Sequence, residues 1–323
     1  MNDELKKIVG LMLEKQKILL ICHTKPDGDT LSCAYALKSI LEEYGKEIKI
    51  ACSDKVSKRL EFICDTKIYL PEEIKEDESF DLVVTVDCAS ISMLGNCNEL
   101  IKKAYCVKID HHYSNDDYAN INYSEPDTAS CSEIIYDIAE YLDKMSFHVC
   151  ELLYTGISFD TGCFKHSNVK ENTHKKAAYL ISRGVNSNEI NRRLFDNKTK
   201  NEINALKLAY NSIEFFKDGK IAIVCIDNKM KDELGLSDDD LADLAQIPIA
   251  IENVKLGITV KEKSDEPHVF KISMRSIPGT DASEICKKLG GGGHICAAGG
   301  KVKAAGREQA IKTIIDIAQT MVD

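Results

Sequence analysis

Three apolar stretches of this sequence end in the same way, and together they decide its fold. Leu19-Leu20-Ile21-Cys22 runs into His23, Val83-Val84-Thr85-Val86 runs into Asp87, and Val107-Lys108-Ile109 runs into Asp110-His111-His112. Each stretch is short and mainly apolar, as buried strands are. Ligands bind outside the carboxyl ends of the strands in open α/β sheets, so three strands that deliver Asp or His to that edge predict one shared site.

The first half of the chain alternates such apolar runs with amphipathic segments, a pattern typical of a mostly parallel sheet flanked by helices. The expected strands are Lys17–Cys22, Glu47–Cys52, Asp81–Val86 and Ala104–Ile109. The expected helices are Leu31–Tyr44, Cys131–Leu142 and Phe147–Ile157. We therefore expect an α/β fold whose N-terminal domain covers residues 1–186.

The second half of the chain predicts a helical linker and a smaller domain. Residues 171–216 are polar and helix-like, and we place the linker at residues 187–212. The segments that follow are a strand at Ile221–Ile226, two alternating runs at Lys255–Lys261 and His268–Ser276, a helix from Ala282, a glycine cluster and a helix through Ile311–Met321. The two alternating runs can pair as antiparallel strands. Residues 213–323 are thus expected to form an α/β domain with a mixed sheet.

Composition and charge exclude several classes of protein. The 323 residues are 44% hydrophobic and 29% charged, which is typical of a globular protein. A net charge of -10 argues against a protein that coats long nucleic acid. The start of the chain carries acids, and no apolar run approaches the ~18 residues that cross a bilayer, so we expect a cytoplasmic protein. Thirteen cysteines without a C-x-x-C pair favour reduced thiols.

Acids and histidines are unusually dense at the expected strand ends. The residues in question are His23, Asp27, Asp29, Asp87, Asp110, His111 and His112. One such acid is explained as a helix cap, but so many would repel each other without a bound cation. Carboxylates mixed with imidazoles suit Mn²⁺ or another octahedral divalent ion better than Ca²⁺. Asp160, after the expected helix at Phe147–Ile157, is a further candidate.

These residues carry a resemblance to a known family. His23-x-x-x-Asp27-x-Asp29, Asp87, Asp110-His111-His112 and Asp160-Thr161-Gly162 resemble, in this order, the four motifs of the DHH phosphoesterase superfamily. The superfamily includes RecJ exonucleases, family II inorganic pyrophosphatases, cyclic dinucleotide phosphodiesterases, and nanoRNases that also dephosphorylate 3′-phosphoadenosine 5′-phosphate (pAp).

The resemblance implies a site for two divalent metal ions, which we expect to be Mn²⁺. His23 and Asp27 would bind one ion, Asp29, His111 and Asp160 would bind the other, and Asp87 would bridge both. The resemblance also implies that His112 contacts the phosphate or transfers a proton, and that Asp110 orients the histidines. His112, Asp87 and Asp110 are thus the expected catalytic residues.

Two motifs of the second half supply the positive charge that a phosphate needs. Ser273-Met274-Arg275-Ser276 ends an expected strand with an arginine, which suits bidentate binding of phosphate. One glycine explains a helix end, but Gly290 is followed by Gly291, Gly292 and Gly293 and then by His294. Backbone N–H groups of such a run can approach an anion closely. With Ala297-Ala298-Gly299-Gly300, these motifs resemble the DHH-associated C-terminal domain, which implies that Arg275, His294 and the glycines bind the substrate.

Ser130 is a weaker candidate for phosphate binding. It precedes the expected helix at Cys131–Leu142, where a serine also serves as the helix cap, and both interpretations remain open at this stage.

The length of the chain selects among the functions of the superfamily. A RecJ-like exonuclease needs added DNA-binding domains and a basic groove with stacking aromatic residues, and this sequence shows neither. We therefore expect a hydrolase of very short oligonucleotides such as nanoRNA and pApA, with pAp as a further substrate and with neither long duplex nucleic acid nor a membrane as partner. A cyclic dinucleotide phosphodiesterase is the alternative. A non-catalytic nucleotide sensor is disfavoured by the complete set of ligands, and a monomer and a homodimer both stay open.

Overall fold

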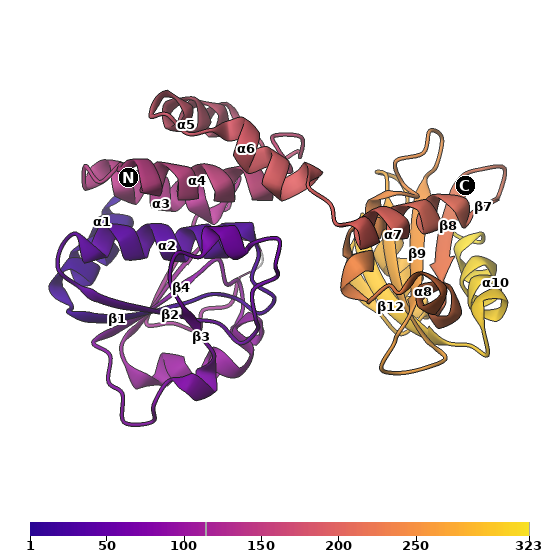
Figure 1. The fold of residues 1–323 in the computed structure, drawn as a ribbon, viewed down its shortest axis with the longest axis horizontal. Helices are drawn as coiled ribbons and strands as arrows, with labels where there is room; N and C mark the ends of the chain where they lie inside the picture. The colour runs from indigo at the N-terminus through magenta and orange to yellow at the C-terminus, as the bar shows by residue number, and fades with distance from the viewer. Residues whose placement is uncertain (114, 323) are drawn as a thin grey trace. The chain divides into compact units, whose positions relative to one another are not determined.

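The protein consists of two compact units (Figure 1). The computed structural model describes residues 1–113 and 115–322, and the units are Met1–Asn197 and Lys198–Asp323. The segment that we expected to be a linker is divided between them. Helix α6 (Ser187–Asn191) and the π-helical turn η4 (Arg192–Asp196) belong to unit 1, and α7 (Lys200–Asn211) belongs to unit 2.

Unit 1 is built on a six-stranded sheet in the order β3-β2-β1-β4-β5-β6, and every pair of neighbours is parallel. The strands are β1 (Lys17–Ile21), β2 (Glu47–Ala51), β3 (Ile68–Tyr69), β4 (Leu82–Val86), β5 (Cys106–Asp110) and β6 (Ile121–Ser124). Sequence patterns missed β3 and β6, because both are short, mostly half-buried edge strands without an apolar run. The strand order reverses between β1 and β4, which makes this the switch point where such sheets bind ligands.

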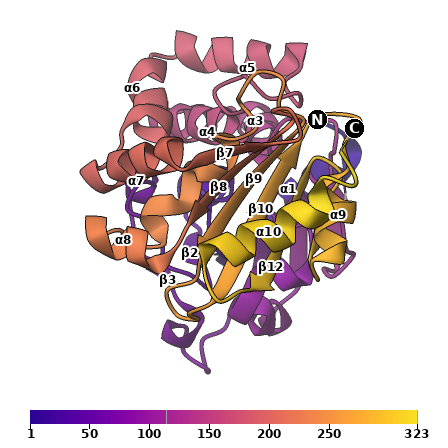
Figure 2. The same cartoon turned by 90° about the vertical axis from the view of Figure 1, so that its right-hand side faces the viewer.

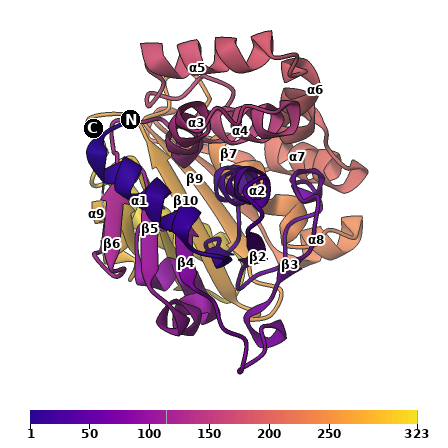
Figure 3. The same cartoon turned by 90° about the vertical axis from the view of Figure 1, so that its left-hand side faces the viewer.

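Helices cover one face of this sheet and a 3₁₀ segment covers the other (Figure 3). The covering helices are α1 (Asp3–Glu14), α2 (Gly28–Glu42), α3 (Cys131–Tyr141) and α4 (Phe147–Asp160), with α5 (Glu171–Ser182) packed against α3 and α4. The opposite face packs against η3 (Ile91–Lys103), and the short turns η1 (Glu61–Ile63) and η2 (Pro71–Glu73) lie in the β2–β4 connection. The central strands β1, β4 and β5 are therefore buried on both faces, which explains their largely apolar sequences.

Unit 2 contains a six-stranded mixed sheet in the order β11-β12-β10-β9-β8-β7 (Figure 2). The strands are β7 (Ile213–Phe216), β8 (Ile221–Ile226), β9 (Leu256–Glu262), β10 (Val269–Ser276), β11 (Gly292–His294) and β12 (Ala297–Lys303). β9 and β10 pair antiparallel as expected, whereas β8 and β9 are parallel. The expectation of helix through Phe216 was wrong, because Ile213–Phe216 pairs with β8. The glycine-rich β11 and β12 gave no strand signal.

Two layers flank this second sheet. Helices α9 (Ala282–Lys288) and α10 (Arg307–Ala318) pack on one face, and α7 with the 3₁₀ segment η5 (Asp239–Gln246) packs on the other over β8 and β9. Helix α8 (Asn228–Leu234) follows β8. Among the described residues, no helix has the length and apolar character needed to cross a membrane. All thirteen cysteines are free thiols, as expected.

Candidate metal centre

The carboxyl ends of β1, β4 and β5 bring the expected acids and histidines together. His23 follows β1, Asp87 follows β4, and Nε2 of His23 lies 3.7 Å from Oδ2 of Asp87. His111 follows β5, with its Nε2 3.4 Å from Oδ1 of Asp87. The expectation that these strands end at one site is therefore met at the switch point between β1 and β4.

The start of α2 adds Asp27. Its Oδ1 accepts hydrogen bonds from the backbone N–H groups of Asp29 at 2.9 Å and Thr30 at 3.1 Å, so Asp27 caps the helix. The same oxygen lies 3.5 Å from Nε2 of His23. Gly28 stands between the two acids because a Cβ there would lie 2.5 Å from the ring of Phe159. Capping and close packing together fix the position of Asp27 before any ion is bound.

Asp29 is fully buried and is held by the first turn of α3. Its Oδ2 accepts from the N–H of Cys131 at 2.6 Å, and its Oδ1 accepts from the N–H of Ser132 at 3.0 Å. A Cβ on Gly156 in α4 would lie 1.9 Å from Oγ of Ser132 and 2.7 Å from Oδ1 of Asp29. Sequence reasoning missed Gly156, although a glycine inside an apolar helical pattern is itself a sign of close packing.

The remaining ligand candidates come from α4 and from the segment after β5. Asp160 is the last residue of α4, and its Oδ2 lies 3.2 Å from Nε2 of His111. Nδ1 of His112 lies 2.8 Å from Oδ1 of Asp110 and 3.6 Å from Oδ1 of Asp87. Lys108, buried in β5, donates to Oδ1 of Asn115 at 2.7 Å and so ties down the loop that carries the histidines. Sequence reasoning did not single out this lysine.

Three groups of side chains within this cluster have the geometry of metal sites, with one ligand atom of each residue lying within 4.8 Å of the others. The groups are His23 with Asp27 and Asp87, Asp29 with His111 and Asp160, and Asp87 with His111 and His112. They contain all six residues that the sequence analysis expected to bind metal. Asp87 belongs to two of the groups, with His23 and Asp27 in one and with His111 and His112 in the other, and His111 also belongs to two.

The electrostatics of the cluster call for a cation. Burial raises the pKa of Asp29 well above its usual value, and neighbouring Asp87 and Asp160 raise it further. Burial also raises the pKa of Asp87. Burial lowers the pKa of His111, but its bonds to Asp160 and Asp87 outweigh this and raise it to about 12. A divalent cation would relieve the same repulsion by taking the place of these protons.

Two buried carboxylate oxygens test whether a metal ion fits. Oδ1 of Asp87 has only the ion pairs with His111 at 3.4 Å and His112 at 3.6 Å, and neither it nor Oδ2 of Asp110 accepts a well-aligned hydrogen bond within the part of the chain that the structure describes. Buried carboxylate oxygens are costly without a partner. Asp87 also has a φ of 59°, in the left-handed region, which is strain of the kind found at functional sites. The donor set and this oxygen of Asp87 therefore fit a bound divalent ion.

In unit 2, Arg275 and His294 lie in one row of the sheet. Arg275 of β10 pairs with Ala297 of β12, which pairs with His294 of β11. Directly paired residues place their side chains on the same face of a sheet, and small Ala297 separates the two basic ones. Met274, next to Arg275, packs into the core on the opposite face. Arg275 is half-buried and His294 is exposed, so this face can meet a ligand.

Most glycines of the run are explained by the backbone geometry of unit 2, which we had not expected. Gly290, with a φ of 71°, ends α9, and the N–H of Gly291 donates to the carbonyl of Cys286. A Cβ on Gly291 would lie 2.0 Å from the carbonyl oxygen of Gly299, and one on Gly293 would lie 2.6 Å from that of Ala297. Gly292 has open space around it. Because β11 is the edge strand, its outer edge still presents peptide groups to a ligand.

Ser130, the remaining candidate for phosphate binding, caps helix α3. It is fully buried at the start of α3, and its Oγ accepts a hydrogen bond from the N–H of Glu133 at 3.3 Å. Helix capping accounts for this hydroxyl, so the structure gives the alternative of phosphate binding no support.

Comparisons with known proteins agree with this architecture. Residues 17–157 match the family model described as DHH family, N-terminal domain, and residues 218–320 match the DHHA1 domain. The bifunctional oligoribonuclease and PAP phosphatase NrnA of Bacillus subtilis is 26% identical over 313 residues, which cover 94% of this chain and 93% of that protein. The cyclic-di-AMP phosphodiesterase GdpP of Geobacillus thermodenitrificans is 24% identical over 88% of this chain, but over only 44% of its own length.

A solved structure shows the same fold. An exopolyphosphatase-related protein from Bacteroides fragilis superposes with a TM-score of 0.89 at 20% identity, covering 98% of this chain and 96% of that one. The α/β fold with a parallel first sheet and a mixed second sheet is thus confirmed.

Proposed function

We propose, because this chain belongs to the DHH phosphoesterase family, that it is a metal-dependent phosphodiesterase that hydrolyses very short oligonucleotides. Its substrates would be nanoRNA and linear dinucleotides such as pApA, with pAp dephosphorylated at the same site. The observation that carries the proposal is the buried group of Asp and His side chains around Asp87. The similarity to the oligoribonuclease and PAP phosphatase of Bacillus subtilis, over nearly the full length of both chains, supports the choice of substrate.

The metal ligands in this proposal are those of the cluster. His23 and Asp27 would hold one divalent ion, and Asp29, His111 and Asp160 would hold a second. Asp87, which is grouped with His23 and Asp27 and also with His111, would be shared. Carboxylate and imidazole ligands together suit Mn²⁺. Such ions stabilise charge on phosphoryl oxygens and lower the pKa of water, which supplies the hydrolytic chemistry.

His112 and Asp110 have a separate role. Burial would raise the pKa of Asp110, but the hydrogen bond from His112 outweighs this and lowers it, so the carboxylate is ionised and can only accept. Nδ1 of His112 therefore carries the proton that it shares with Asp110, and Nε2 is left to face the substrate. There it can hold a phosphoryl oxygen or move a proton to the leaving oxygen.

Unit 2 contributes binding of a second phosphate in this proposal. Arg275 offers a fork of N–H donors that matches a phosphate, and His294 lies in the same row of the sheet. The outer edge of β11 at Gly291, Gly292 and Gly293 adds backbone groups. Metal ions bound in unit 1 would do little more than balance its aspartates, so in this proposal the charge that holds the rest of the substrate comes from these residues.

A panel of four substrates tests the proposal. Wild-type protein with Mn²⁺ is assayed on pApA, an RNA pentamer, pAp and cyclic di-AMP, and Asp87→Asn serves as the control for contaminating nucleases. We expect turnover of the first three, with cyclic di-AMP the poorest substrate. A preference for cyclic di-AMP would favour the alternative that the similarity to the cyclic-di-AMP phosphodiesterase raises. No turnover of any of the four would favour a nucleotide sensor instead.

A further inference from the structure

One face of unit 2 concentrates basic side chains. On strands β10 and β12, alternate residues face away from the core that α9 and α10 cover. These residues are Val269, Lys271, Ser273 and Arg275 on β10 and Ala297, Gly299, Lys301 and Lys303 on β12. Four of the eight are basic and none is acidic, although the whole chain has a net charge of -10. Such separation of charge marks a surface that attracts anions.

The three lysines among these eight residues have no partner within the described part of the chain. Lys271, Lys301 and Lys303, which we call the lysine strip, are exposed and have neither an ion pair nor a side-chain hydrogen bond within the described part of the chain. Lys261, which pairs with Lys271 on the next strand, instead donates to the carbonyl of Leu241 at 3.0 Å beneath η5. The strip thus lies on the part of the sheet next to that covered by η5, and its charges are available to a ligand.

The strip continues the face that carries Arg275 and His294. Lys271 pairs with Lys301, and Lys271 is four residues from Arg275, which is about 14 Å along a strand. Between them lies the row of Ser273, Gly299 and Gly292, whose small side chains leave a shallow floor. A nucleotide chain with one phosphate bound at Arg275 could therefore extend over this row of small residues to the lysines.

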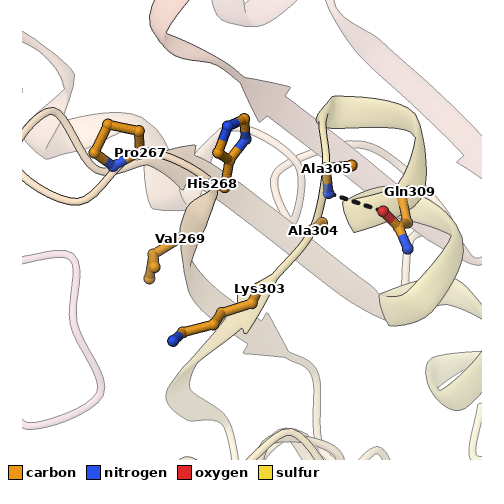
Figure 4. Close-up of a pocket in the computed structure, with 7 residues that line it drawn as sticks. All are labelled: Pro267, His268, Val269, Lys303, Ala304, Ala305 and Gln309. Carbon is orange, nitrogen blue, oxygen red and sulfur yellow. Dashed lines mark hydrogen bonds between the residues drawn. The ribbon is translucent and has the colours of Figure 1, made fainter.

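A hollow closes the far end of the strip (Figure 4). It has a volume of about 390 Å³ and is lined by Pro267, His268, Val269, Lys303, Ala304, Ala305 and Gln309. Val269 and Lys303 are paired there, and Figure 4 shows both side chains pointing away from Gln309 of α10. Lys303 therefore belongs both to the lysine strip and to the rim of this hollow.

We infer that the lysine strip binds further phosphates of a single-stranded RNA that has one phosphate held at Arg275. This inference rests on the proposed function and deepens it, because it assigns a residue set that favours oligomers of three to five nucleotides over dinucleotides. Continuity with Arg275 on β10 and with His294 on the neighbouring strand β11 favours the substrate strand itself over an unrelated anion. The floor of glycine and serine accepts any base, so binding here is independent of sequence.

The test compares two double variants that remove the same charge. Lys271→Gln/Lys301→Gln neutralises the strip, and Lys287→Gln/Lys288→Gln neutralises two exposed lysines at the end of α9 on the opposite side of the sheet. For the strip variant we expect kcat/KM on an RNA pentamer to fall about tenfold and its dependence on log salt to become shallower by about 1.4, since each single-strand phosphate contact contributes ~0.7. On pApA, kcat/KM should change less than twofold.

A binding measurement separates this inference from the proposed function. Fluorescence anisotropy of a labelled pentamer in EDTA needs no turnover. If the wild type and the α9 variant bind the pentamer more tightly than the strip variant does, the strip stands even where no substrate is cleaved. If the strip variant loses pApA and pentamer turnover equally, or if the α9 variant shows the same loss, the assignment of the strip is overturned while dinucleotide hydrolysis would still uphold the proposed function.

Discussion

The metal centre of unit 1 and the basic face of unit 2 use charged residues in opposite ways. At the metal centre, Asp29 and Asp87 are 0% and 2% exposed, and two backbone N–H groups of α3 hold the two carboxylate oxygens of Asp29. On the basic face, Arg275 is half-buried, and His294 and the lysines are exposed. Buried, fixed carboxylates hold reacting groups in one geometry, whereas exposed cations must leave room for a ligand that comes and goes. Substitutions should therefore act on kcat in unit 1 and on KM in unit 2.

The largest effect is expected for Asp87→Asn in unit 1. Asp87 is shared by two of the three candidate metal groups, so its loss should lower the turnover of pApA to background and reduce the bound Mn²⁺. Metal content is measured by elemental analysis of dialysed protein, and kcat by release of mononucleotide. A variant that keeps its full metal content and its activity would refute the bridging role.

Asp110→Asn should have the next largest effect. The carboxylate orients His112 through a 2.8 Å hydrogen bond, and partners of this kind typically contribute about 10–100-fold to activity. We expect kcat on pApA to fall within that range, while the metal content stays that of the wild type because Asp110 is in none of the three metal groups. Loss of metal together with activity would instead make Asp110 a ligand.

Arg275→Ala tests the opposite side of the comparison. A hydrogen bond to a charged group contributes about 1.5–3 kcal/mol, so KM for pApA should rise by at least about tenfold. Because Arg275 lies in unit 2, the variant should keep both kcat, within a few-fold, and bound Mn²⁺. His294→Ala is expected to behave in the same way with a smaller increase, since His294 is exposed and carries its charge only when protonated. A fall in kcat with unchanged KM would contradict the division between the units.

The two regions also differ in how much of each could be predicted from the sequence. Strands β1, β4 and β5 were predictable because burial on both faces gives unbroken apolar runs, and the acids that follow them mark the site. The support of this site was not predictable. The N–H groups of Cys131 and Ser132 that hold Asp29 come from 102 and 103 residues away, and backbone donors leave no trace in residue type.

In unit 2, the residues were predictable and their arrangement was not. Arg275 and His294 are recognisable by motif, but their shared row depends on the register of β10, β12 and β11. Glycine-rich β11 and β12 carry no strand signal, since glycine has low β-propensity and no side chain to pack. The lysine strip is therefore invisible in the sequence, where its members are separated by other residues and by a helix.

The smallest effect concerns the packing that supports the metal centre. Gly156→Ala would place a methyl group 1.9 Å from Oγ of Ser132 and 2.7 Å from Oδ1 of Asp29, so α4 must shift away from α3. Overpacking of this kind costs about 1–3 kcal/mol, and each kcal/mol lowers the Tm of a unit of this size by about 2–4 °C. We therefore expect a lower Tm for unit 1, measured by thermal unfolding, and a few-fold lower kcat because Asp29 moves.

Two further variants decide whether crowding at Gly156 is the cause. Gly10→Ala, in the interior of α1, meets no atom within 4 Å, so it should stabilise the protein by about 0.5–1 kcal/mol through its higher helix propensity. Ser132→Ala removes the nearest clashing atom, and in the Gly156→Ala background it should restore part of the Tm and of kcat. If Ser132→Ala gives no such recovery, the cost at Gly156 arises elsewhere, and the contact between α3 and α4 is not what positions Asp29.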